Sequence, residues 1–267
     1  MLMAPQQRVE NALPAKRHAE LLQLLQSRGQ MSVRELAAHF EISDDTVRRD
    51  LDLLAGQSLL TRTHGGAVAL TALVHRDSTF MQRMGTRTEE KRRIANAATE
   101  LIEDGETLLI NGGSTTRLFA AQLRRRNLTV VTNNLSVPGA LSAEVTRDVY
   151  LVGGQYKEDA QVTIGPVAAS GIPISVDTAV IGVGGITARE GLTTTVLEEA
   201  SMIASMINVA RRTIVLADAS KLGKCSFAHI GPLSSMQILI SNTSPDEELT
   251  RALAEAKVQF ILASAQG

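Results

Sequence analysis

The chain has 267 residues, of which 44% are hydrophobic and 21% charged, as in an ordinary globular protein. This excludes a collagen-like, coiled-coil or wholly disordered chain, and the length suggests about two domains. A single cysteine, Cys225, excludes an internal disulfide and a cysteine zinc site. No apolar run is long enough for a transmembrane helix, and residues 1–17 lack a secretory apolar core. We therefore expect a cytoplasmic protein without a membrane partner.

Charge is balanced along the chain. The formal net charge is −1, and residues 1–66 carry 8 basic against 8 acidic side chains. The net charge therefore does not indicate a nucleic-acid binder, and any contact with DNA must depend on where single charged residues are placed. Aromatic residues make up only 3% of the chain, which argues against a stacking platform for single strands.

The N-terminal part predicts a small helical unit. Residues 1–14 show no periodic apolar pattern and are predicted to be a flexible tail. A first helix is predicted from Arg17 to Gly29. A second is predicted after Ser32, which has a glutamate three residues later, as in a capping box. A third is predicted after Ser43, with two acidic residues in its first turn.

The segment 32–54 has the spacing of a helix-turn-helix, and a glycine hairpin predicted over 59–68 follows it as a wing. Polar side chains on the outward face of the last helix and on the wing can contact bases and phosphates. The candidate DNA-binding residues are Ser32, Ser43, Asp45, Thr46, Arg48, Arg49, Arg62, Thr63 and His64. Asp45 opposes phosphate, and it either caps the helix or accepts a hydrogen bond from cytosine. The pattern alone equally allows a three-helix unit that docks on the next domain.

The rest of the chain predicts an α/β domain. We predict a winged helix-turn-helix over 15–70, a linker over 71–87 and an α/β effector-binding domain over 88–267. A helix is predicted over Thr88–Glu103, and short apolar strands then alternate with helices, which is typical of a mostly parallel sheet covered on both faces. The predicted strands are 107–110, 128–131, 149–152, 179–183, 213–217, 237–240 and 258–262, and the later helices are 118–123, 135–141, 198–210 and 246–256.

The sequence Gly112-Gly113-Ser114-Thr115-Thr116 follows the first of these strands and begins a helix. Glycines and a helix N-terminus direct N–H groups at an anion, and the hydroxyls add donors. No Gly-Lys-Ser/Thr follows, so the sequence is not a P-loop. An ordinary strand-to-helix turn with a capping hydroxyl fits the pattern equally well.

Polar turns also follow the later strands. Loops after parallel strands share one edge of the sheet, where ligands bind, so these turns predict one pocket. Carboxylates and amides there suit sugar hydroxyls, and Lys221 suits a phosphate. The candidate effector-binding residues are Gly113, Ser114, Thr115, Thr116, Asn133, Gly153, Gly154, Asp177, Glu199 and Lys221. Taken alone, Asp177 also fits a strand entry, and Glu199 fits a solvated helical turn.

Residues 42–67 closely resemble the DNA-binding region of the DeoR family of bacterial repressors. The match includes Ser43, Thr46–Leu51 and His64–Ala67, and it departs at Gln57-Ser58, where the family usually has its glycine. The GSTT loop, the Thr132-Asn133-Asn134 turn and the DASKLG sequence at 218–223 resemble the family's sensor domain. That sensor is related to ribose-5-phosphate isomerase, glucosamine-6-phosphate deaminase and CoA transferases. The resemblance implies a winged helix-turn-helix and a sugar phosphate seated against Ser114, Thr115 and Thr116.

We therefore expect a repressor of a carbohydrate-metabolism operon, released from double-stranded operator DNA by a phosphorylated sugar. We expect a homodimer or homotetramer, because a symmetric dimer doubles the site read by one small helix-turn-helix. No cofactor, metal or catalytic residue is expected. Two enzyme alternatives compete with this interpretation: isomerisation or deamination through Asp177, Glu199 and Lys221, and dinucleotide binding at Gly182-x-Gly184-Gly185, where the fingerprint is incomplete.

Overall fold

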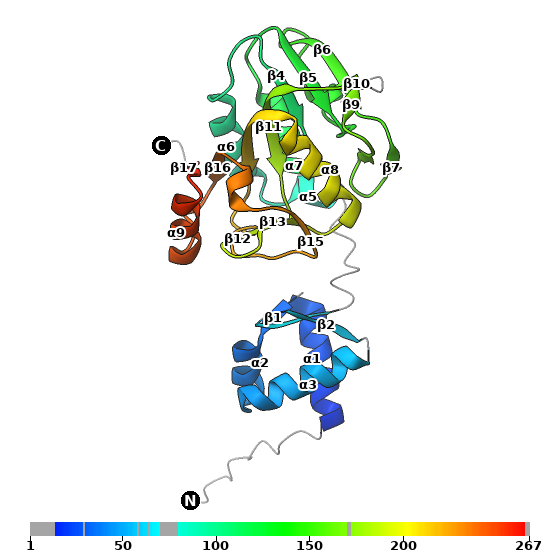
Figure 1. Cartoon of the computed structure of the whole chain (residues 1–267), viewed down its shortest axis with the longest axis vertical. Helices are drawn as coiled ribbons and strands as arrows, with labels where there is room; N and C mark the ends of the chain where they lie inside the picture. The colour runs from blue at the N-terminus through cyan, green and yellow to red at the C-terminus, as the bar shows by residue number, and fades with distance from the viewer. Residues whose placement is uncertain are drawn as a thin grey trace, which may run out of the picture. The chain divides into compact units, whose positions relative to one another are not determined.

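A computed structural model describes residues 14–28, 30–57, 59–63, 65–69, 80–169 and 172–264. The chain divides between Arg76 and Asp77 into two compact units, shown in Figure 1. No helix among the described residues is long and apolar enough to cross a membrane.

The first unit consists of three helices and a small antiparallel sheet, with strand order β1-β3-β2. Its core is built from leucines of all three helices together with Met31, Val33, Val47 and Ala67. The predicted hairpin is confirmed as β2 and β3, which pair from Leu60↔Ala69 to Thr63↔Gly66. The elements are α1 (Pro14–Arg28), β1 (Gln30–Ser32), α2 (Val33–Phe40), α3 (Asp44–Gly56), β2 (Leu60–Thr63) and β3 (Gly66–Ala69).

Both predicted helix caps are confirmed. Ser32 Oγ accepts the Glu35 N–H at 3.2 Å, and Glu35 Oε2 accepts the Ser32 N–H at 2.7 Å, which completes the capping box. Ser43 Oγ accepts the Thr46 N–H at 3.3 Å. The caps satisfy amide groups that an isolated helix leaves unpaired, and so they define where α2 and α3 begin.

The second unit begins within the range predicted as a linker. Helix α5 (Phe80–Gly85) lies inside 71–87, and its Phe80 is buried. The Phe80 N–H also donates to the Asp159 carbonyl at 2.8 Å. A helix of this length shows too few turns for a periodic pattern, which is why the sequence predicted a linker here. Residues 71–79 lie outside the described residues.

The second unit is built on a seven-stranded parallel sheet with the order β17-β16-β14-β11-β4-β5-β6. The mostly parallel sheet predicted from the sequence is therefore confirmed. The strands are β4 (Thr107–Ile110), β5 (Leu128–Thr132), β6 (Thr146–Leu151), β11 (Val176–Gly182), β14 (Ala210–Leu216), β16 (Ile238–Ser241) and β17 (Gln259–Leu262).

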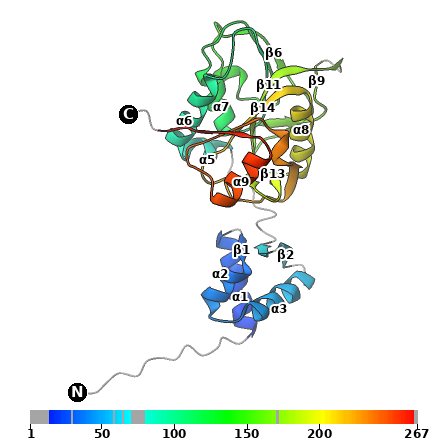
Figure 2. The same cartoon turned by 60° about the vertical axis from the view of Figure 1, so that its left-hand side comes forward.

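Helices cover both faces of this sheet. Figure 2 shows α6 (Thr88–Thr99) and α7 (Ser114–Gln122) on one side and α8 (Leu197–Asn208) on the other. Each side has its own apolar core, since Ile94 and Phe119 belong to one cluster and Met206 to a second. Leu249 and Leu253 of α9 (Glu247–Glu255) join the α8 side.

The direction of strand addition reverses between β4 and β11. From β4 the chain builds outward through β5 to β6, and from β11 it builds the other way through β14 and β16 to β17. Ligands of open parallel sheets bind at such a reversal, outside the carboxyl ends of the strands. The fold thus directs attention to the loops after Ile110 and Gly182.

Two parts of the second unit differ from the sequence-based expectation. The helix predicted over 135–141 is only a 3₁₀ turn, η1 (Pro138–Ala140), because Pro138 and Gly139 both disfavour a longer helix. Short antiparallel strands and a further turn were not predicted. They are β7 (Gln155–Lys157), β8 (Val162–Ile164), β9 (Ala168–Ala169), β10 (Ile172–Pro173), β12 (Gly185–Thr187), β13 (Gly191–Thr194), β15 (Ala228–Gly231) and η2 (Leu233–Ser235).

Candidate DNA-binding face and effector site

Helix α3 has one buried and one polar side. Val47 and Leu51 are fully buried, while Asp45, Arg48 and Arg49 are exposed. Arg48 Nη1 and Asp45 Oδ1 form an ion pair at 2.9 Å, whereas Arg49 makes no ion pair with a described residue. This helix therefore presents one neutralised and one unneutralised arginine on the face predicted to contact DNA.

A buried carboxylate fixes α3 to α1. Asp50 accepts hydrogen bonds from Arg17 Nε at 2.7 Å and from His18 Nε2 at 2.8 Å. Burial by itself raises the pKa of Asp50, but the hydrogen bonds from Arg17 and His18 outweigh burial and leave that pKa below its ordinary value. The sequence match placed Asp50 in the family motif, and the structure gives it a positioning role behind the recognition face.

The wing is tied to α3 through Arg62. Its Nε lies 2.8 Å from Asp52 Oδ1, and its Nη1 donates to the Gly66 carbonyl at 3.2 Å. The Arg62 guanidinium thus holds strand and helix together, and its predicted contact with DNA stays a prediction. The Thr63 side chain and the whole of His64 lie outside the described residues.

The hydroxyls predicted to contact DNA take part in the caps. Ser32 Oγ also donates to Glu35 Oε2 at 2.8 Å, and Ser43 Oγ lies 2.9 Å from Thr46 Oγ1. They stand at the N-termini of α2 and α3, where a helix dipole and uncommitted amides favour a phosphate.

In the second unit, the N-terminus of α7 lies at the carboxyl end of β4. Gly113, at the N-cap position, has φ of 148°, a conformation that favours glycine, and provides no side-chain cap. Ser114 and Thr115 are buried, and neither side chain hydrogen-bonds to another described residue. The first-turn amides and these two hydroxyls are thus available as donors to an anion.

Thr116 differs from its two neighbours. Its hydroxyl is fully buried and lies within hydrogen-bonding distance of the Asn111 carbonyl, at 2.9 Å, and of the Gly113 carbonyl, at 3.1 Å. Its hydroxyl shapes the loop, unlike that of Ser114, and its predicted contact with the effector stays a prediction. Asn111, which the sequence did not single out, joins β4 to β11: Nδ2 donates to the Gly182 carbonyl at 2.8 Å, and Oδ1 accepts the Gly182 N–H at 2.7 Å.

Asn133 contributes an unsatisfied acceptor at the carboxyl end of β5. Its Nδ2 donates to the Thr163 carbonyl at 2.8 Å, while its buried Oδ1 has no hydrogen-bond partner among the described residues. Buried polar atoms are almost always paired, so this oxygen fits an incoming hydroxyl. Glu199, in the first turn of α8, accepts a hydrogen bond from the Thr194 hydroxyl at 3.1 Å. Thr194 also packs against Gly184, where a Cβ would be too close to the Thr194 backbone.

Positive charge gathers after β14. Asp218 is buried and pairs with Arg87 Nη1 at 3.0 Å. Burial raises the pKa of Asp218, but hydrogen bonds from Ser220, the charge of Lys221 and the Arg87 contact together hold it below its ordinary value. Lys91 is also buried, and burial lowers its pKa against the opposing charge of Asp218.

Of the cations near Asp218, the sequence predicted Lys221 as a ligand residue but did not single out Arg87 or Lys91. Lys91 Nζ donates to the carbonyls of Arg83 and Thr86, at 2.5 and 2.9 Å. Both side chains come from α6 and its N-cap, more than a hundred residues before the loop that they meet, and no local spacing reveals them. The carboxyl end of β11 therefore lies between two features: the N-terminus of α7, which follows β4, and the cations near the loop after β14.

Asp177 lies away from the other predicted effector residues, and Gly154 has a packing role. Asp177 lies at the amino end of β11, on the opposite edge of the sheet, where it accepts the Thr107 N–H at 2.9 Å and pairs with Arg211 at 3.3 Å. This corrects the prediction, since the residue has the strand-entry role. Gly154 is required for packing, because a Cβ there would overlap the Ile164 carbonyl, and Gly153-Gly154 follows the outermost strand, β6.

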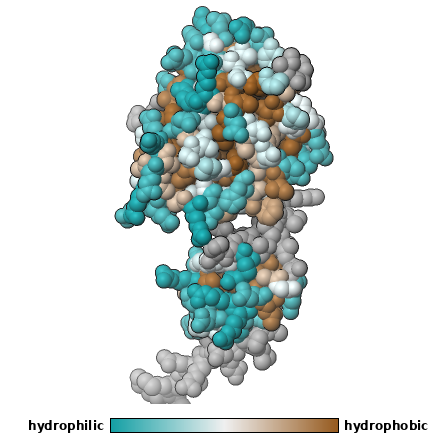
Figure 3. Space-filling view, in the orientation of Figure 1, coloured by the Kyte–Doolittle hydropathy of each residue, from teal (hydrophilic) through white to brown (hydrophobic). Residues whose placement is uncertain are grey.

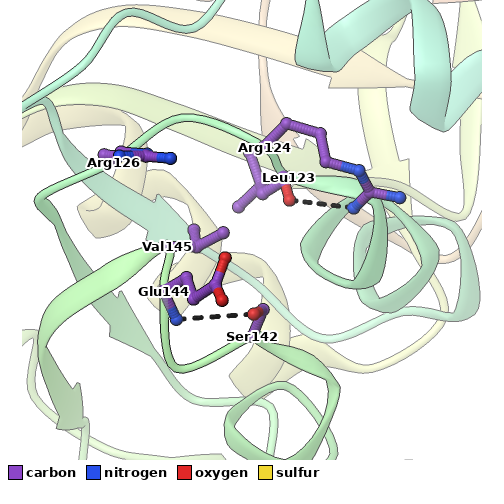
Figure 4. A pocket seen from close by; sticks show the side chains of 6 residues that line it. All are labelled: Leu123, Arg124, Arg126, Ser142, Glu144 and Val145. Atoms are coloured by element: carbon purple, nitrogen blue, oxygen red, sulfur yellow. Dashed lines mark hydrogen bonds between the residues drawn. The ribbon is translucent and has the colours of Figure 1, made fainter.

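A hollow of about 390 Å³ lies elsewhere in the second unit. Its lining residues, drawn in Figure 4, are Leu123, Arg124, Arg126, Ser142, Glu144 and Val145. Leu123 follows α7 and Val145 precedes β6, so this hollow lies at the amino edge of the sheet, away from the residues above. Arg124 Nη1 is already used there by the Leu123 carbonyl at 3.0 Å.

The dinucleotide alternative does not survive. Gly184 and Gly185 lead into strand β12 rather than into a helix, and a Cβ at either would overlap neighbouring backbone. A dinucleotide fingerprint requires a helix N-terminus immediately after its glycines.

The first unit is a winged helix-turn-helix, and the second is an α/β unit whose strand order reverses where ligands usually bind. Together they define the class of ligand-responsive DNA-binding regulators. The model of the DeoR-like helix-turn-helix domain matches residues 17–72, and that of the DeoR C terminal sensor domain matches residues 86–243. The chain belongs to the DeoR family.

Three relatives illustrate the match. The HTH-type transcriptional repressor CsqR of Escherichia coli K12 is 34% identical, over 92% of this chain and 94% of its own length. The glycerol-3-phosphate regulon repressor of the same organism is 31% identical, over 92% and 98%. The lactose phosphotransferase system repressor of Streptococcus mutans is 30% identical, over 88% and 95%.

Among solved structures, ribose 5-phosphate isomerase A from Methanocaldococcus jannaschii is similar over 51% of this chain and 55% of that chain, at 15% identity and a TM-score of 0.34. A likeness at this score supports no conclusion. The relation to isomerase and CoA-transferase folds stays a prediction.

Proposed function

We propose that this protein is a cytoplasmic transcriptional repressor that binds duplex operator DNA through α3 and the wing and is released by a phosphorylated sugar. Its family membership and its repressor relatives support the DNA-binding role. Two features together support a sugar phosphate as the effector. They are the N-terminus of α7, which has no side-chain cap, and the buried Asn133 Oδ1, which has no hydrogen-bond partner among the described residues. The first suits a phosphate, and the second suits a sugar hydroxyl.

A sensor fits these residues better than an enzyme. Proton transfer on a sugar needs an acid and a base beside the reacting carbons. Of the three candidates, Asp177 lies at the other edge of the sheet and Glu199 is engaged by Thr194. Release then requires only that the effector bind more tightly to a conformation with low affinity for DNA.

The proposal is tested by thermal shift of the full chain against three- to six-carbon sugar phosphates, with the unphosphorylated sugars as matched controls. A ligand at 100 times its Kd adds about 2.7 kcal/mol to stability. The active compound is then titrated into the complex of protein and selected operator DNA. Stabilisation by a sugar phosphate together with DNA release supports the proposal. Equal stabilisation by the unphosphorylated sugar, or turnover of the compound, contradicts it.

A further inference from the structure

The outermost strand β6 is an open sheet edge. Five of its six residues are exposed, and its apolar residues Val149, Tyr150 and Leu151 expose 39%, 45% and 53% of their surface. Figure 3 shows apolar side chains, in brown, reaching the surface in the upper part of the second unit, where Figure 1 places β6. Natural proteins usually blunt such an edge with charge, proline or a bulge. The charges of Arg147 and Asp148 and the register shift against β5 lie in the first half of β6, and the strand ends in three apolar residues.

The backbone of β6 identifies which groups are open. The Val152 N–H donates to the Thr132 carbonyl of β5 at 2.8 Å. Because alternate residues of a strand point their N–H and C=O groups to opposite sides, those of Tyr150 face β5. The N–H and C=O groups of Val149 and Leu151 then point outward, and they hydrogen-bond to no described residue.

The side chains of the three residues divide between the two faces of the sheet. Val149 pairs with Val130 of β5, which belongs to the core on the α6–α7 side. Tyr150 pairs with Val131, which belongs to the core on the α8 side. Val149 and Leu151 therefore extend one face of the sheet beyond its edge, and Tyr150 extends the other.

We propose that β6 is the interface through which two copies of this chain associate, pairing antiparallel about a two-fold axis at Tyr150. In this register Val149 of each copy exchanges both backbone hydrogen bonds with Leu151 of the other. Tyr150 meets Tyr150 of the other copy as a non-hydrogen-bonded pair, about 4.5 Å apart at Cα. Apolar clusters close on both faces, and aromatic pairs stabilise such contacts.

This register sets all three apolar residues against apolar residues of the other copy, whereas an axis at Leu151 would set Val149 against Gly153. An axis at Asp148 would set two carboxylates against each other, and an axis at Val149 would set Tyr150 against Asp148. We assign a second copy as the partner because the outward N–H and C=O groups of Val149 in one copy match those of Leu151 in the other. A two-fold contact of this kind also ends at a dimer and does not propagate. The proposed repressor function enters only in this choice, since two winged units read two half-sites.

The first test removes one outward donor. Proline at 149 deletes an N–H that faces away from β5, so the internal ladder keeps its bonds. Sedimentation velocity of the purified full chain, without DNA, should show a parent dimer or a multiple of it, and at least a tenfold weaker association for Val149→Pro. The matched control is Leu262→Pro on the opposite edge strand β17, where the Ala263 N–H faces β16 and that of Leu262 faces outward. A monomeric parent, or equal association of Val149→Pro and the parent, overturns the proposal.

The second test fixes the register. In a Cys225→Ala background, Tyr150→Cys should form a disulfide-linked dimer on mild oxidation, because the paired Cα atoms lie within disulfide range. Val149→Cys should not, since two such residues are two positions out of register. Cross-linking through position 149 and not 150 overturns the assigned axis. Failure of the parent dimer to bind DNA would count against the proposed function and leave this interface intact.

Discussion

Arg17 of α1 donates two hydrogen bonds to Asp50 of α3, from Nε to Oδ2 at 2.7 Å and from Nη2 to Oδ1 at 3.1 Å. The pair is largely buried, with 14% and 10% of the two side chains exposed. It fixes the position of α3 from the side that packs on α1.

Replacing Asp50 by Asn should destabilise the first unit by about 3 kcal/mol, because breaking one partner of a buried ion pair leaves the other charge uncompensated. Hydrogen exchange of α1 and α3 amides in the full chain measures this local stability. Asp52→Asn, which removes the exposed acid on the same helix, should change it by less than about 1 kcal/mol. Equal effects would show that the buried pair is not special.

The Asp50 contribution should also depend on pH. Its folded pKa is lowered, so the unfolded chain takes up the proton first as pH falls. The stabilisation is present above the ordinary aspartate pKa of about 3.9 and is lost as pH falls through the lower, folded value. The difference in α3 protection between the parent and Asp50→Asn should therefore hold from neutral pH to about 5 and shrink below about 4. A gap that widens on acidification would reverse the sign assigned here.

Arg49→Ala should weaken operator binding by about 1–3 kcal/mol while leaving the fold intact. The side chain is exposed and makes no ion pair with a described residue, so little packing is lost. Titration at several salt concentrations separates the contacts, because loss of a phosphate contact lowers the salt slope by about one. Arg211→Ala, at the amino edge of the sheet in the second unit, is the matched control. Unchanged binding for both Arg48→Ala and Arg49→Ala would refute the recognition-helix assignment.

Asp45→Asn should tighten binding to any duplex, with little preference among sequences. The Asp45 carboxylate holds Arg48 at 2.9 Å and repels phosphate, and an exposed pair of this kind adds at most about 1 kcal/mol to stability. Fluorescence anisotropy with operator and scrambled DNA measures both affinities. Weaker binding to the operator alone would instead mean that the carboxylate reads a base.

Thr115→Asp should abolish the response to the effector and leave DNA binding unchanged. A carboxylate in the first turn of α7 suits the helix dipole, but it repels a phosphate by about 4 kcal/mol at 4 Å and an effective dielectric of 20. The readout is the sugar phosphate concentration needed to release operator DNA. Asp177→Asn is the control, because Asp177 lies at the opposite edge of the sheet. A normal response in Thr115→Asp would move the pocket elsewhere.

Local chemistry explains what the sequence could predict. Ser32 and Ser43 predict helix starts because their capping partners lie three residues later in the sequence. The continuously apolar strands predict a parallel sheet because both faces of such a sheet are covered. The α7 loop was found for the same reason, since glycines and hydroxyls sit together in one short segment.

Contacts made across the fold were not predictable in this way. The predicted strand 179–183 already left Asp177 before the amino end, and only the contacts of its carboxylate with the Thr107 N–H and with Arg211 decide for the strand-entry role. Arg87 and Lys91 carry no motif, and only the packing of α6 against the β14 loop makes them neighbours of Asp218. The roles of Thr116 and Asn111 follow from backbone carbonyls and amides that a pattern of side chains does not contain.

Arg87 links the start of the second unit to the end of β14. It adopts a left-handed backbone conformation, with φ of 51°, between α5 and α6, and its guanidinium reaches Asp218 at the end of β14. Lys91 clasps the carbonyls of the same turn. An anion that drew Arg87 away from Asp218 would loosen the first corner of this unit, the one nearest along the chain to the DNA-binding unit.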